Sequence, residues 1–97
     1  MIVIWRSMRE RLRIRRATRR REEAAIRRAV DHFEASRGVR AMGGHVLRLD
    51  DHEAIVRVMY LTDHVPPDRA WFTVSADGDA VRELSFDDVR ALESPWR

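Results

Sequence analysis

This chain of 97 residues contains no cysteine and no lysine. Without cysteine the protein has no disulfide framework, no thiol nucleophile and no thiolate ligand for a metal. A reducing cytoplasm fits this composition. The missing lysine means that all 19 basic residues are arginine, which a GC-rich genome explains as readily as a need for guanidinium chemistry.

Long apolar runs are missing too. The N-terminal Met-Ile-Val-Ile-Trp is far shorter than the ~20 apolar residues of a spanning helix, and no positive charges precede it as in a signal peptide. The sequence leaves open whether translation starts at Met1 or at Met8, and if it starts at Met8 the residues before it matter little. With 44% hydrophobic and 36% charged residues, we expect one folded domain over residues 1–97.

Charge is divided unevenly along the chain. Residues 1–40 contain 13 arginines and 5 acidic residues, net +8, whereas residues 41–97 contain 6 arginines and 11 acidic residues, net −5, and together these give the overall +3. Such asymmetry predicts a basic element that meets an anionic partner, or an acidic patch on a second copy of the chain.

One long helix is predicted in the N-terminal part. No proline or glycine interrupts residues 7–36, and Gly38 is a suitable C-terminal stop. Arg15, Arg19 and Glu22 interrupt its apolar face in the middle. Apolar residues recur on that face at helical spacing, namely Ile4, Met8, Leu12, Ile26, Ala29, Val30 and Phe33.

Four strands are predicted after the helix. Residues 45–49 and 53–61 form a first hairpin, and the proline pair in residues 62–68 predicts a loop. Residues 69–76 and 79–86 form a second hairpin across Asp77-Gly78, which suits a two-residue type I′ turn.

A short C-terminal helix follows these strands. Ser85 and Asp88 have the spacing of a capping box, which would open a helix through Val89 and Leu92.

The fold class is therefore α+β. A long N-terminal helix packs on a four-stranded antiparallel sheet in the manner of a cystatin-like roll, with the short helix at the C-terminus. A small SH3-like or Sm-like barrel is the alternative. Because apolar residues lie on both faces of residues 53–61, the second face needs cover from the C-terminal helix, the N-terminal segment or another subunit.

The helix is predicted to be longer than the sheet is wide. Four strands ~4.8 Å apart make a sheet ~19 Å wide, whereas ~30 helical residues extend ~45 Å. The denser apolar stripe lies in residues 26–33. We therefore expect residues 22–97 to form the compact core and the arginine-rich residues 1–21 to project.

Residues 9–21 contain eight arginines, the strongest functional signal in the sequence. Guanidinium groups bind phosphates bidentately, and displaced counterions add salt-dependent affinity. Arg13, Arg16 and Arg20 are the main expected phosphate contacts. Residues 17–22, Ala-Thr-Arg-Arg-Arg-Glu, are similar to arginine-rich RNA-binding helices. The predicted nucleic-acid-binding residues are Arg9, Arg13, Arg15, Arg16, Arg19, Arg20 and Arg21.

Other interpretations of this segment stay open. A solvated charged face is one, and an acidic protein surface is another partner. An anionic membrane surface is less favoured, because Arg15 and Arg19 would lie on the face that inserts.

Catalytic and metal signals are weak. The four histidines lack the spacing of a zinc site, and there is no glycine loop for a phosphate or dinucleotide. The Asp-His pairs at residues 50–52 and 63–64 are expected to lie in turns, where Asp side chains form local hydrogen bonds with the backbone. We therefore predict no metal, no cofactor and no enzymatic activity.

Three functions follow in order of preference. The first is a non-enzymatic binding protein whose helix contacts nucleic acid largely without sequence specificity. The second is a protein–protein interaction subunit, regulator or inhibitor, as a homodimer or larger homo-oligomer. The third is a small-ligand enzyme of cystatin-like fold, with His45 as the one candidate inside a strand. The loop at residues 63–71 is a further candidate for recognition.

Overall fold

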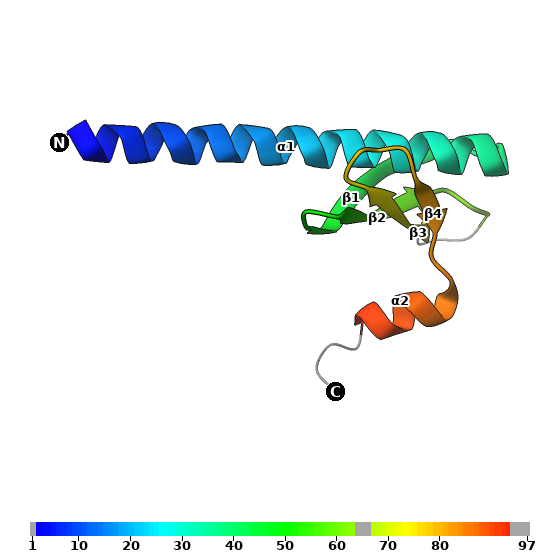
Figure 1. Cartoon of the computed structure of the whole chain (residues 1–97). Coiled ribbons are helices and arrows are strands. Elements are labelled where there is room, and N and C mark those ends of the chain that lie inside the picture. Colours follow the sequence, from blue (N-terminus) through cyan, green and yellow to red (C-terminus); the bar gives the residue numbers. More distant parts are fainter. Residues whose placement is uncertain (1, 64–66, 94–97) are drawn as a thin grey trace.

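A computed structural model of the chain describes residues 2–63 and 67–93. It confirms the predicted α+β class and the order of elements (Figure 1). The antiparallel strands follow one another across the sheet, and the two outer strands do not pair, so the sheet is open and the barrel alternative is wrong. The elements are α1 (Ile2–Arg37), β1 (Ala41–Leu49), β2 (Glu53–Tyr60), β3 (Asp68–Ser75), β4 (Val81–Glu83) and α2 (Phe86–Glu93).

The core lies between the C-terminal half of α1 and one face of the sheet. Ala25, Ala29 and Phe33 are buried there at successive turns of the helix. Phe33 is completely buried, and its ring lies 6.4 Å from that of Phe72 and 4.8 Å from that of Tyr60. Small side chains at two helical turns let α1 approach the sheet closely, and one large ring fills the end of the interface.

Strand β1 begins at Ala41, earlier than the predicted residue 45. The sequence places Gly43-Gly44 before the strand, but both glycines pair with β2. A Cβ at Gly44 would lie 2.9 Å from the Cγ2 atom of Ile26, so a glycine is needed where β1 passes beneath α1. The predicted start of the strand at residue 45 was wrong, because Gly44 is required by the packing of α1 on β1 and does not mark a turn before the strand.

The second hairpin also differs from the prediction. A two-residue type I′ turn needs a positive φ at Asp77, but positive φ occurs only at glycines among the described residues. The connection between β3 and β4 has five residues, 76–80, with Ser75 N donating to Ala80 O and Gly78 N, at φ +78°, donating to Ser75 O. The longer loop leaves β4 only three residues, in place of residues 79–86.

Helix α2 begins as predicted, with a reciprocal capping box. Ser85 N donates to Asp88 Oδ2, and Asp88 N donates to Ser85 Oγ, both at 3.2 Å. The helix lies on the side of the sheet opposite α1 (Figure 1). Val89 is 6% exposed and Ile55, which faces this side, is 4% exposed, so α2 covers part of the second face.

The molecule is elongated. Its radius of gyration is 16.3 Å, compared with roughly 12.5 Å for a compact domain of this length. The 36 residues of α1 span ~54 Å at 1.5 Å per residue, close to the longest dimension of 57 Å. Figure 1 shows the reason, since the N-terminal half of α1 extends well beyond the sheet.

Candidate nucleic-acid interface

Helix α1 leaves the sheet at Arg21. This side chain donates through Nη2 to the main-chain oxygen of Asp50 at 2.5 Å, in the turn between β1 and β2. Ala25 is the first buried residue among those whose side chains the structure describes, and almost every residue from Arg9 to Arg20 is exposed. We call residues 9–20 the overhang.

Four arginines of the overhang form one stripe. Arg9, Arg13, Arg16 and Arg20 follow the i, i+4, i+7, i+11 spacing of a single helix face, and they line one shallow groove. By helical spacing this face points away from the sheet, opposite Ala25 and Ala29. The stripe includes all three arginines that we expect to be the main phosphate contacts.

Two more predicted arginines lie outside the stripe, on a flank of the overhang. Arg15 is two heptads before Ala29, and Arg19 is one heptad before Ile26, so both continue the face that docks on the sheet. Beyond the sheet this face has no core to cover, and both side chains are exposed. The overhang therefore presents arginines on more than one side.

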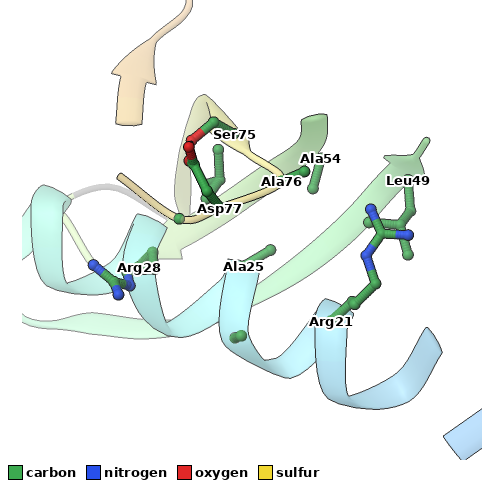
Figure 2. Close-up of a pocket in the computed structure, with 11 residues that line it drawn as sticks. Arg21, Ala25, Arg28, Leu49, Ala54, Ser75, Ala76 and Asp77 are labelled. Carbon is green, nitrogen blue, oxygen red and sulfur yellow. The ribbon is translucent and has the colours of Figure 1, made fainter. Parts of the chain in front are cut away.

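Arg21 differs from the other six predicted residues because the compact part of the molecule binds it. With Arg28, two turns further along α1, it borders a cavity of about 140 Å³ beneath the second hairpin turn (Figure 2). Asp77 from that turn also lines the cavity. Its pKa is lowered by the hydrogen bond from the Ser75 hydroxyl, so a carboxylate opposes any anion here.

Acidic turns surround the point where the overhang begins. Because Glu53 pairs with Ser75, the β1–β2 and β3–β4 turns lie at the same end of the sheet. These turns contain Asp50, Asp51, Asp77 and Asp79. The Asp50 carboxylate accepts hydrogen bonds from the main-chain N–H groups of Glu53 and His52, which lower its pKa. Negative charge is thus concentrated beside the base of a positive rod.

Sequence reasoning missed one arginine that extends the stripe. Arg27 lies one heptad after Arg20 and is exposed, so the outward stripe continues from the overhang onto the docked half of α1. The heptad spacing of Arg13, Arg20 and Arg27 was a signal that could have identified it.

The chemistry of the overhang follows from its unpaired cations. None of its seven arginines forms an ion pair with another residue of the described ranges 2–63 and 67–93. Glu10 is its only acidic residue. Like charges on successive turns repel, so a partner with closely spaced anions would relieve this repulsion while accepting bidentate hydrogen bonds.

The other candidates stay apart from this interface. Asp50 serves the turn before β2, as predicted, and His45 is exposed on edge strand β1. His64 and part of the candidate recognition loop lie outside the described residues. No group of three or more metal-ligating side chains occurs in the described chain, and none of its helices is long and apolar enough to cross a membrane.

Comparison with known proteins adds no relative. No family model matches the chain, and neither does any curated protein or solved structure.

Proposed function

We propose that the protein is a non-enzymatic, cytoplasmic binding protein whose overhang contacts the phosphates of nucleic acid, largely without reading sequence. The observation that carries this proposal is the exposed arginine stripe, which extends past the sheet and has no ion-pair partner in the described chain. From Arg9 to Arg20 the stripe spans ~16 Å of helix, which is enough to meet several phosphates of a duplex or a folded RNA.

The residue types of the overhang favour phosphate contact over base readout. Side chains of Asn and Gln commonly read base edges, and α1 contains neither. Arginine can read guanine, but arginines on several sides of a rod match rows of phosphates better than one base edge. We expect similar affinities for unrelated sequences.

The test is a fluorescence titration of the full chain with labelled duplex DNA and structured RNA. If about four phosphates are contacted, affinity should fall by roughly 150-fold between 50 and 200 mM salt. Replacing the four arginines of the stripe by glutamine should abolish most of that dependence. The stripe residues to replace are Arg9, Arg13, Arg16 and Arg20.

A matched control removes the same charge from the compact part of the molecule. Replacing Arg40, Arg69, Arg82 and Arg90 by glutamine changes net charge equally but leaves the overhang intact. If the control loses as much affinity as the stripe variant, binding depends on overall charge and the assignment to the overhang is wrong. Absence of binding to either nucleic acid at low salt rejects the proposal altogether.

A contact with a protein is the second candidate. Leu12 is 50% exposed and Ile14 is 64% exposed, so the overhang also presents apolar side chains to solvent. A homodimer or an acidic protein partner would cover them. Sedimentation equilibrium at tens of micromolar protein tests the homodimer hypothesis, because a monomer under those conditions argues against self-association.

A further inference from the structure

A groove lies between α2 and the second face of the sheet, and Arg37 at the C-terminal end of α1 borders it. We call it the Trp71 groove. Its volume is about 340 Å³, at the lower end of the usual size range of small-molecule sites. Its principal walls are Arg69 and Trp71 of β3, Leu84 after β4, and Phe86, Val89 and Arg90 of α2.

The walls of the groove are mainly apolar and include two aromatic rings. Trp71 is half-buried beneath α2, and Val89 packs at its inner end with 6% exposure. Phe86 is 76% exposed, the highest value among the large apolar side chains described. An exposed phenyl ring beside a half-buried indole offers two π faces to a flat ligand.

Positive charge in the groove is not balanced from within. Arg69 and Arg90 form no ion pair in the described part of the chain. The carboxylate of Glu83, which also lines the groove, is bound by Arg37 at 2.6 Å. Two guanidinium groups are therefore available where no carboxylate remains free to neutralise them.

A third cation lies next to Trp71 on the same face of the sheet. Arg57 is its cross-strand partner in β2, and the Arg57 Nε atom is buried with no hydrogen-bond partner among the described residues. A buried unpaired donor is unfavourable, and its positive charge adds to the field around the groove. The charge of this region complements an anion.

We propose that the Trp71 groove binds a small organic acid with a flat aromatic body. The ring lies against Trp71 and Phe86, and the anionic group accepts hydrogen bonds from Arg69 and Arg90. Arg90 is already held near this position, with its guanidinium carbon 5.8 Å from the centre of the Phe86 ring. Arg37 at the end of α1 borders this site, but no residue of the overhang lines it.

The test is calorimetric titration of the full chain with 1-naphthoate, with uncharged 1-naphthylmethanol and inorganic sulfate as partial ligands. We expect saturable binding of one naphthoate, and much weaker binding of either partial ligand. Replacing Arg69 and Arg90 by glutamine should weaken naphthoate binding tenfold or more, since each hydrogen bond to a charged group contributes about tenfold. The control, Arg28→Gln with Arg40→Gln, removes equal charge away from the groove and should bind naphthoate normally.

A second measurement does not depend on how well the variants fold. In the wild-type protein, naphthoate should shift the NMR signal of the Trp71 indole N–H, which the Trp71→Phe variant identifies. No saturable binding, equal binding of the uncharged alcohol, unchanged affinity in the folded double variant, or an unmoved Trp71 signal would each overturn the proposal.

Discussion

Deleting residues 1–20 should leave the rest of the chain folded. The described side chains of the overhang contribute nothing to the buried core, which begins at Ala25. The deletion keeps Arg21 and its hydrogen bond to Asp50, and it keeps every residue of α1 that packs on the sheet. The overhang should therefore be dispensable for stability and required for binding nucleic acid.

Two small effects determine the expected change in unfolding free energy. The shortened helix begins without a capping side chain, which costs about 1 kcal/mol. Removal of like-charged arginine pairs, such as Arg9 with Arg13 and Arg16 with Arg20, relieves about 0.2–0.5 kcal/mol each. These effects oppose one another, so we expect a net change within about 1 kcal/mol.

Urea unfolding followed by far-ultraviolet circular dichroism measures this change. The dependence of free energy on urea should also be unchanged, because it scales with the surface exposed on unfolding and the overhang buries little of it. A loss of more than about 2 kcal/mol, beyond what an uncapped helix end costs, would show that residues 1–20 pack on the compact part or on a second copy. That result would refute the projecting-helix interpretation.

Three further predictions concern the compact part. Phe33→Ala should destabilise it by about 3–5 kcal/mol in urea unfolding, because a fully buried ring is lost from the helix–sheet interface. Gly44→Ala should cost about 1–3 kcal/mol by forcing β1 away from α1, whereas Gly43→Ala, with open space around its Cβ, should cost little. The pKa of Asp88 is lowered chiefly by the hydrogen bond from Ser85 N–H. Its stabilisation of α2 is thus complete above the unfolded pKa near 3.8 and disappears as pH falls through the lower folded value. Asp88→Asn should reduce that loss in an acid titration followed by NMR, and an unchanged profile would contradict the assignment.

Elements with strong local patterns could be predicted from the sequence. The long run without proline or glycine predicted α1, and the dense apolar residues predicted β2 and β3. The Ser85–Asp88 spacing predicted the start of α2. Each of these depends on neighbours in the chain. The start of β1 and the second turn could not be predicted in the same way. Gly44 is required by its contact with Ile26, which is far away in sequence. In the second turn only Gly78 has a positive φ, which excludes the predicted type I′ turn.

The candidate sites likewise include residues that the sequence alone identifies and residues that only the fold brings together. The arginines of the overhang are visible in the sequence, but assigning Arg21 to the compact part required knowing where the sheet ends. The Trp71 groove was not predicted as a site, although Arg69 and Trp71 belong to the candidate recognition segment at residues 63–71. It exists because the chain turns after Leu84 and places α2 across Trp71, which brings Arg69 and Arg90 to one groove from separate elements.

The acidic turns at the base of the overhang should restrict where phosphates bind. Asp51 and Asp79 are exposed there, and neither carboxylate accepts a hydrogen bond from the described part of the chain. At ~10 Å in water each would repel a phosphate by a few tenths of a kcal/mol, and salt screens this interaction. Asp51→Asn with Asp79→Asn should therefore tighten binding about two- to fivefold at 50 mM salt and much less at 200 mM.

The control, Asp31→Asn with Asp87→Asn, makes the same change in net charge away from the base. Equal tightening in both variants would mean that only total charge matters. Tightening in the first alone would mean that the turns hold the nucleic acid toward the free end of α1.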